Sequence, residues 1–192
     1  MKKSFVPNLH LALVHHPVVN KSGDVIAAAV TNLDLHDIAR AARTYAVGPL
    51  YVVTPLNDQR QLVERLIDHW TRGAGAAYNP KRRQALELIR ITETLEGVIE
   101  DIRNGTAGTP PKTIVTSARN SRSTISYGRL RRMMQDDRPY LLIFGTAWGL
   151  AQSVISGANY MLEPVMGNKD YNHLSVRSAA AIILDRLVGR FA

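Results

Sequence analysis

The chain has 192 residues, of which 45% are apolar, so we expect one globular domain over residues 1–192 with a core of its own. Because it contains no cysteine, disulfides, thiolate zinc sites and a cysteine nucleophile are all excluded. The 24 Lys and Arg residues outnumber the 16 Asp and Glu residues, and the formal charge is +8. This excess favours a polyanionic partner, although an ordinary basic enzyme could carry it too.

No apolar run reaches the roughly 18 residues of a membrane-spanning helix. The basic start at Met1–Phe5 is not followed by the apolar segment of a signal peptide. We therefore expect a cytoplasmic protein without a membrane anchor.

In the first half of the chain, short apolar runs alternate with helical patterns. We expect, in chain order, a strand from Leu9 closed by Pro17, a loop over 20–24, a helix over 37–45 capped by Asn32 or Asp34, and a strand over 50–53. A second amphipathic helix follows, capped by Asn57, with Leu62, Val63, Leu66 and Ile67 on one face and Trp70 at its end. The glycine-rich segment 73–80 is expected to be a flexible connection.

The second half continues the alternation. We expect a short helical turn running into a strand at 89–91, a helix over 95–104 capped by Thr94, strands over 113–116, 141–144 and 160–162, and helices over 150–155 and 174–188. Short apolar strands between helices indicate an α/β fold with a parallel sheet covered on both faces. In such sheets ligands bind beyond the carboxyl ends of strands, here after Val53, Val115, Phe144 and Leu162.

Three loops directly follow predicted strands, over 116–124, 145–150 and 163–176. Their glycines permit close backbone approach, and their backbone groups can hold a ligand by its edges. Neither glycine loop matches a phosphate-binding fingerprint. A glycine after a strand is more often only a turn residue, so the order and spacing of the loops carry the interpretation.

In three places the chain resembles the SPOUT methyltransferases. Residues 32–53 resemble the family's first motif, an Asn-containing loop, a helix with an arginine and a strand. Residues 142–150 resemble the second motif, a strand ending in a glycine loop. Residues 162–182 resemble the third, a Pro and Gly loop that leads into a helix of small residues.

This resemblance implies a three-layer α/β fold with a C-terminal trefoil knot, a homodimer, and an S-adenosylmethionine-dependent enzyme that methylates tRNA or rRNA. It implies that the knot loops hold the cofactor, mostly through backbone atoms. The implied cofactor contacts are Thr116, Ser117, Gly145, Thr146, Trp148, Gly149, Leu162, Pro164, Gly167, Asn172, His173, Leu174 and Ser175.

Two residues are candidates for catalysis. Arg40 matches the arginine of the first motif, and His173 could accept the proton of the acceptor group. An arginine is a poor base, so Arg40 could instead fix a phosphate or a developing negative charge. Where a branch of the family usually has Glu, this chain has Ala147 and Trp148, which leaves base and ribose acceptors both open.

Arginines in two regions could bind the RNA backbone. The candidates are Arg43, Arg119, Arg122, Arg131 and Arg132, with Lys81, Arg82 and Arg83 as a second cluster and Tyr78 and Tyr127 for base stacking. The alternative is two separate solvated clusters. We expect no metal site at His15 and His16, because adjacent strand residues point to opposite faces.

Two other functions remain open. The first is an RNA-binding protein of the same fold without catalysis, which the missing second-motif Glu would favour. The second is a doubly wound enzyme acting on a nucleotide or another small substrate, against which the lack of a phosphate loop counts.

Overall fold

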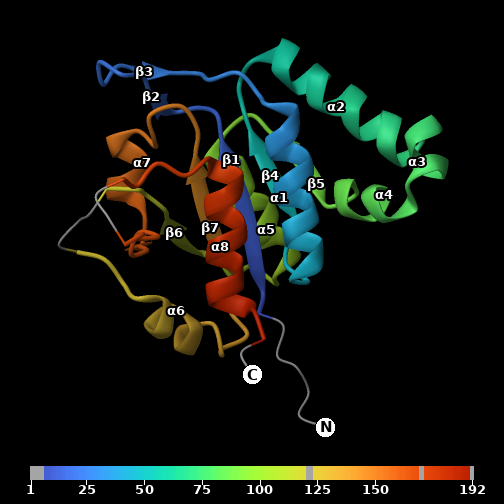
Figure 1. The fold of residues 1–192 in the computed structure, drawn as a ribbon. Coiled ribbons are helices and arrows are strands. Elements are labelled where there is room, and N and C mark those ends of the chain that lie inside the picture. Colours follow the sequence, from blue (N-terminus) through green and yellow to red (C-terminus); the bar gives the residue numbers. More distant parts are fainter. Residues whose placement is uncertain (1–6, 120–122, 169–170, 191–192) are drawn as a thin grey trace, which may run out of the picture.

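A computed structural model describes residues 7–119, 123–168 and 171–190. Its core is a six-stranded sheet in the order β5-β4-β1-β7-β6-β8, and every neighbouring pair is parallel (Figure 1). The strands are β1 (Leu9–Val14), β4 (Leu50–Val53), β5 (Ile89–Thr92), β6 (Lys112–Val115), β7 (Tyr140–Gly145) and β8 (Tyr160–Met161). The predicted parallel sheet is therefore confirmed.

Helices cover both faces of this sheet, as predicted. One face packs against α1 (Asn32–Thr44), α4 (Pro80–Leu86), α6 (Tyr127–Met133) and α8 (Val176–Val188). The other packs against α5 (Leu95–Gly105) and α7 (Gln152–Gly157). In the central strand, Leu11 and Leu13 belong to the first core while Ala12 and Val14 belong to the second, so the strand is buried on both sides.

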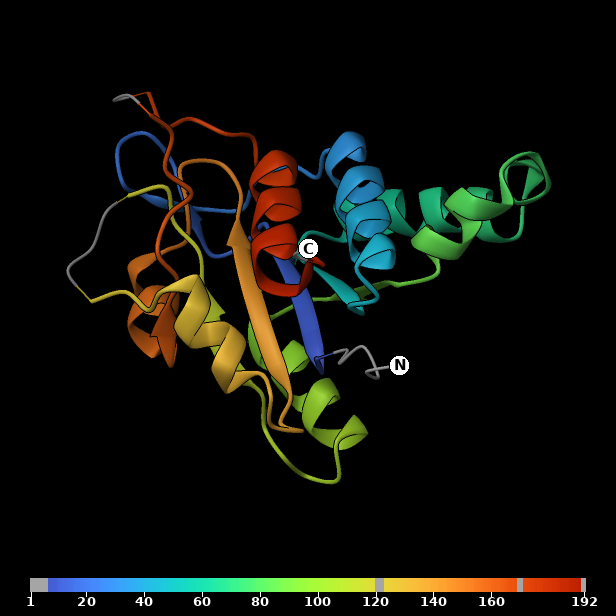
Figure 2. The ribbon, with the colours of Figure 1, turned by 60° about the horizontal axis from the view of Figure 1, so that its bottom comes forward.

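Helices α2 (Asn57–Thr71) and α3 (Ala74–Tyr78) extend beyond the β5 edge of the sheet together with α4 (Figures 1 and 2). The prediction of a flexible connection over 73–80 is wrong, because α3 and the start of α4 occupy it. The local reason is that Asn79 caps α4 by accepting a hydrogen bond from the Arg82 N–H at 3.0 Å, with Pro80 in the first turn. Gly75 fits against the Trp70 indole, where a Cβ would lie 2.7 Å from a ring carbon.

Helix starts were predicted with mixed success. Thr94 caps α5 as expected, by accepting a hydrogen bond from the Gly97 N–H at 3.1 Å. The predicted caps of the first two helices are wrong: the N-cap residues are Thr31 and Leu56, and neither makes a side-chain cap hydrogen bond. Asp34 lies inside α1, where its carboxylate accepts a hydrogen bond from Arg177 instead.

The amphipathic face of α2 is narrower than predicted. Val63 is fully buried, and Leu66, Ile67 and Trp70 pack against the core while partly exposed. Leu62, in contrast, is an exposed residue.

A hairpin and a further helix were also not predicted. A hairpin of β2 (Val18–Val19) and β3 (Val25–Ile26) surrounds the predicted loop at 20–24. Helix α6 follows the loop after β6, and Ser126 caps it through the Arg129 N–H. The hairpin and α6 are too short to show a hydrophobic period in the sequence. Packing against the rest of the fold stabilises them.

Candidate functional site

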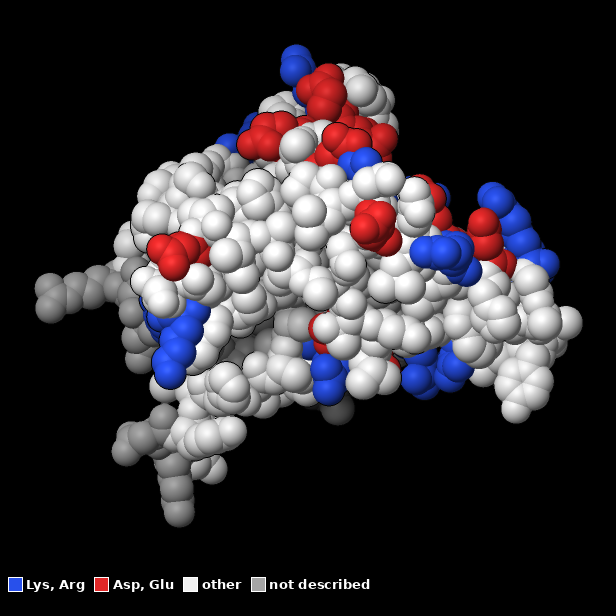
Figure 3. Space-filling view, turned by 90° about the horizontal axis from the view of Figure 1, so that it is seen from above, with Lys and Arg blue, Asp and Glu red and all other residues white. Residues whose placement is uncertain are grey.

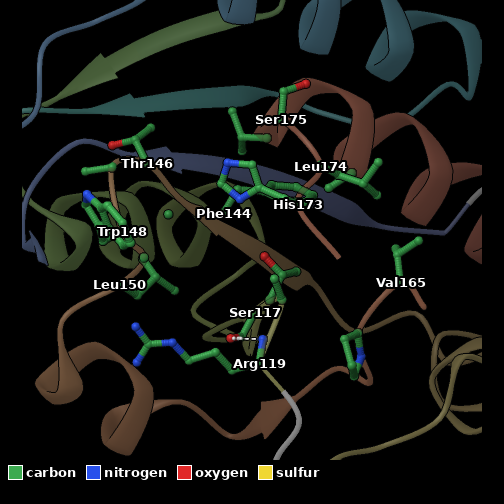
Figure 4. Close-up of a pocket in the computed structure, with 18 of the residues that line it drawn as sticks. Ser117, Arg119, Phe144, Thr146, Trp148, Leu150, Val165, His173, Leu174 and Ser175 are labelled. Atoms are coloured by element: carbon green, nitrogen blue, oxygen red, sulfur yellow. Dashed lines mark hydrogen bonds between the residues drawn. The ribbon is translucent and has the colours of Figure 1, made fainter. Parts of the chain in front are cut away.

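A cavity of about 830 Å³ lies at the carboxyl ends of β6 and β7 (Figure 4). Its wall combines the three loops that follow β6, β7 and β8, the segment before α1, and one side of α8. Its lining includes Val19, Asp34, Thr116, Ser117, Arg119, Gly145, Thr146, Trp148, Gly149, Glu163, Pro164, Asn172, His173, Leu174 and Ser175. The position beyond the strand ends is the one that the sequence predicted.

The loop over 146–151 is held in a tight conformation. A Cβ on Gly145 would lie 2.7 Å from the backbone nitrogen of Leu150, so only glycine fits there without a shift of the loop. Gly149 has φ +115 and Ala147 has φ 51, and the second is a rarely occupied conformation for a non-glycine residue. Thr146 anchors the loop to the central strand, since its hydroxyl donates to the Val14 carbonyl at 3.0 Å.

The loop after β6 forms the opposite part of the wall. The Thr116 hydroxyl donates to the Ile143 carbonyl at 3.0 Å, which fixes the start of the loop on the neighbouring strand. The Ser117 hydroxyl accepts a hydrogen bond from the Arg119 N–H at 3.0 Å (Figure 4). This turn places the Arg119 guanidinium at the wall.

The loop after β8 contacts the loop after β6. The Asn172 side-chain amide donates to the Ala118 carbonyl at 3.1 Å and thereby joins the two loops. His173, an exposed residue, meets the Tyr171 ring edge to face at 6.3 Å. Ser175 ends the loop by capping α8 through the Ser178 N–H.

Both carboxylates in the wall are engaged by protein groups. Asp34 is only 6% exposed and accepts a hydrogen bond from the Arg177 guanidinium at 3.0 Å. Glu163 accepts a hydrogen bond from the Tyr127 N–H at 2.7 Å. The wall also contains the imidazole of His173, which is exposed and is not held by an arginine or a backbone N–H in this way. Of these three side chains it is therefore the better candidate for accepting a proton.

A chain of charges leads from the cavity wall to a second groove. Arg177 pairs with Asp34 and, at 3.7 Å, with Asp37, which in turn lies 3.8 Å from Arg40. This groove of about 370 Å³ lies between α1 and α8. Arg40 therefore lines this groove and does not line the larger cavity.

One buried titratable group lies directly after the central strand. His15 is fully buried, and burial lowers its pKa to about 4 against the opposing effects of the Ala29 backbone and the Asp34 carboxylate. His15 does not line the cavity, but its carbonyl accepts a hydrogen bond from the Ala28 N–H at 2.7 Å and so ties the end of the central strand to the segment that precedes α1.

Most of the predicted cofactor residues come together in one wall. Two do not line it: Leu162 is buried under the loop, where it bridges to Ile125, and Gly167 lies outside the wall. The sequence analysis missed Val19, Asp34 and Glu163. Asp34 lies inside the first motif, so its position was a usable signal, whereas Val19 reaches the wall only through the unpredicted hairpin.

The predicted RNA-binding arginines are spread over the molecule. Arg119 lies at the wall, Arg131 and Arg132 on α6, and Arg43 near the end of α1, while Arg122 lies outside the described residues. Figure 3 looks onto the carboxyl ends of the strands and shows a hollow with separate basic groups around it.

The two basic clusters do not form one surface. Helix α4, with Lys81, packs against α1 and α2, whereas α6 packs against α8 at the other side of the molecule (Figure 1). Arg82 lies over the Trp70 ring at 4.5 Å. Tyr127, expected to stack on a base, is half-buried beneath Arg186, but Tyr78 is 86% exposed.

Within the described residues, no group of three or more His, Asp or Glu side chains has the arrangement of a metal site. In the same part of the chain, the helices are too short or too polar to cross a membrane.

Comparisons with known proteins agree with this geometry. A family model described as SAM-dependent RNA methyltransferase matches residues 8–189. The chain is 48% identical over 182 residues to a protein of Oleidesulfovibrio alaskensis named tRNA (guanine-N(1)-)-methyltransferase. That match covers 95% of this chain but 42% of the relative, so the chain spans less than half of the relative's length.

A protein of Aquifex aeolicus, named as uncharacterized, is 42% identical over 184 residues, with 95% of this chain and 89% of that protein covered. Among solved structures, the SpoU methyltransferase AviRb from Streptomyces viridochromogenes in complex with AdoMet has a TM-score of 0.55 at 18% identity. This similarity covers 95% of this chain and 60% of that one, and it supports the fold.

Proposed function

Because this chain belongs to the family of SAM-dependent RNA methyltransferases, we propose that its cavity binds S-adenosylmethionine and that it transfers the methyl group to a nucleotide of tRNA. The observation that carries the proposal is the convergence of three loops, from the ends of β6, β7 and β8, on one cavity. The name of the Oleidesulfovibrio relative supports tRNA as the substrate. Since this chain spans only part of that relative, the choice of nucleotide and atom is left to experiment.

The cavity fits the cofactor in size and chemistry. Its volume of about 830 Å³ lies toward the upper end of the range for small-molecule sites, roughly 300–1,000 Å³. Gly145, Gly149 and the strained Ala147 keep the backbone of one loop close to the cavity. We propose that the cofactor is held by Thr116, Ser117, Gly145, Thr146, Gly149, Pro164, Asn172, Leu174 and Ser175.

The bound cofactor supplies a methyl group already activated on a sulfonium, so the protein must position the acceptor and remove one proton. We propose His173 as the proton acceptor, since it lies at the wall and is exposed. Arg119 and the arginines of α6, Arg131 and Arg132, are proposed to hold RNA phosphates.

Arg40 fits a role at a subunit interface better than one in the cavity of its own chain. The groove that it lines contains small residues, among them Ala41 and Ala181, which permit close approach of a second helix pair. We propose a homodimer formed through α1 and α8, in which Arg40 and Arg43 serve the shared site. Light scattering after size exclusion should give twice the mass of 21.3 kDa, and a monomer would contradict this.

The finer features of the fold are also proposed. We propose that residues 1–192 form one SPOUT domain whose C-terminal part makes a trefoil knot. Support comes from the loop after β8, which joins the loop after β6 through Asn172 and Ala118 and through the Leu162–Ile125 bridge. A cytoplasmic location follows from the proposed tRNA substrate.

The same fold without catalysis is the second candidate. The observation favouring it is that Ala147 and Trp148 replace the second-motif carboxylate, while Asp34 and Glu163 are already engaged. Such a protein would bind RNA but transfer no methyl group.

The decisive experiment is titration calorimetry with S-adenosylmethionine and S-adenosylhomocysteine, followed by transfer of labelled methyl groups to unmodified tRNA transcripts. Gly145→Arg should abolish cofactor binding, because the side chain has no room. Gly105→Arg is the matched control, since a Cβ there meets nothing within 4 Å. Binding without methyl transfer would favour the non-catalytic candidate, and a folded wild type that binds neither compound would overturn the proposed function.

A further inference from the structure

Trp148 is a large aromatic residue that is exposed to solvent at the mouth of the cavity. It lines the cavity, yet 55% of its surface remains accessible to solvent. Tryptophan has a large apolar face, and an exposed apolar group beside a cavity marks a contact with a ligand or partner. Trp148 is not among the residues that are proposed to hold the cofactor, so its indole is available for another contact at the mouth of the cavity.

The backbone around Trp148 is fixed. Its N–H donates to the Val19 carbonyl at 3.0 Å, and the Val19 N–H donates to the Gly149 carbonyl at 2.9 Å. A bridge between Val18 and Leu150 extends this contact. The β2–β3 hairpin, whose two strands are very short, therefore supports the loop that presents the indole.

Other apolar groups face the mouth from the far side. Figure 4 shows Trp148 at one side of the cavity, with His173 and Leu174 across from it. Leu174 is 44% exposed, and Tyr171, which packs edge to face on His173, is 80% exposed. His173, the proposed proton acceptor, thus lies across from the indole, and Arg119 adds a positive charge to the cavity wall.

We propose that Trp148 stacks on the base of the nucleotide that accepts the methyl group, after that base has left the RNA helix. This inference rests on the proposed function and deepens it. A flat indole suits an unstacked base, because every base has a π-face and enzymes that act on bases extrude them into a pocket. Arg119 then pairs with a flanking phosphate. Trp148, which the sequence assigns to the cofactor, thus contacts the substrate.

The test compares Trp148→Ala and Trp148→Phe with wild type. Affinity for unmodified tRNA transcripts is measured with S-adenosylhomocysteine bound, and KM and kcat are measured for methyl transfer. We expect Trp148→Ala to weaken tRNA binding roughly 5- to 150-fold, the range found for removal of a stacking side chain. Trp148→Phe should keep most of the affinity, and both variants should bind S-adenosylmethionine as wild type does, since the hydrogen bonds between the backbones of residues 148–149 and Val19 remain.

Fluorescence gives an independent readout, because the chain has only two tryptophans, Trp70 and Trp148. Quenching by tRNA should occur in wild type and in Trp70→Phe and should be absent in Trp148→Phe.

The outcomes are distinguishable. If Trp148→Ala binds tRNA and S-adenosylmethionine as wild type does, the stacking role is overturned while the proposed function stands. If both Trp148 variants lose cofactor affinity to the same extent, Trp148 is a wall of the cofactor site and the inference is again overturned. If wild type binds no cofactor, the proposed function fails and the inference fails with it.

Discussion

The two halves of the sheet, on either side of β1, differ in how their strands end. In the short-loop half, β4 and β5 reach their following helices through residues 54–56 and 93–94 only. In the long-loop half, β6, β7 and β8 are followed by residues 116–126, 146–151 and 162–175. All six strands end at the same edge, but the cavity is lined from the long-loop half and from the segment before α1.

The difference indicates a division of labour. Short connections leave little backbone that could face a ligand, so the short-loop half serves mainly to bury apolar surface. Long connections supply backbone groups and glycines, and they hold one another in place through contacts such as Asn172 with Ala118. Substitutions in the two halves should therefore separate stability from cofactor binding.

The largest expected effect is on stability alone. Leu50 in β4 is fully buried, so Leu50→Ala should lower the free energy of unfolding by about 2–5 kcal/mol. The folded fraction should still bind S-adenosylmethionine with wild-type affinity. Chemical denaturation measures the stability and calorimetry the affinity, and a large loss of affinity would contradict the division of labour between the two halves.

The next effect concerns His15, which follows the central strand between the halves. Because burial lowers its pKa to about 4, the unfolded chain takes up this proton at higher pH than the folded protein does. Stability should therefore be complete above about pH 6.5 and fall by about 3 kcal/mol as the pH drops to about 4.

His15→Gln should flatten this pH dependence of the free energy of unfolding. The free energies of unfolding of wild type and variant at pH 8, where His15 is neutral in both states, are the reference. Burial also lowers the pKa values of His10 and His36, so some dependence in the same direction should remain. An unchanged slope in the variant would show that His15 takes no part.

Within the long-loop half, Gly145→Ala should act on binding. Its Cβ would lie 2.7 Å from the Leu150 nitrogen, and the resulting shift of the loop should weaken S-adenosylmethionine binding by roughly 10-fold, or about 1.4 kcal/mol, which is within the range of about 1–3 kcal/mol for overpacking. Gly97→Ala in α5 meets only ordinary contacts and is the matched control from the other half. Equal behaviour of the two variants in calorimetry would contradict the division.

The smallest effects come from a pair of single hydrogen bonds. Asn172→Ala removes the 3.1 Å bond to Ala118 and should weaken cofactor binding by about fivefold, for a loss of about 1 kcal/mol. Thr94→Ala removes the cap of α5 and should cost about 1 kcal/mol of stability without any change in affinity. A loss of affinity in Thr94→Ala together with unchanged affinity in Asn172→Ala would contradict the distinction between the two halves.

In the short-loop half, predictions from local sequence had mixed success. The Thr94 cap and the extent of α5 depend on neighbours in sequence, and both predictions were confirmed. The connection at 73–80 was misjudged because Gly75 is there for close contact with Trp70 and not for flexibility. Local composition cannot tell a glycine that bends the chain from one that admits an indole.

By itself, the sequence determined the alternation of strands and helices, the parallel sheet and the loops in which a ligand site should be sought. Those features follow from hydrophobic period and from residues that end helices and strands. The tertiary structure was needed to show that Val19 reaches the cavity wall, that Arg40 lies in a separate groove, and that the basic clusters stand apart. The reason is physical: these placements depend on contacts between residues far apart in the chain, such as Arg177 with Asp34, which no local period encodes.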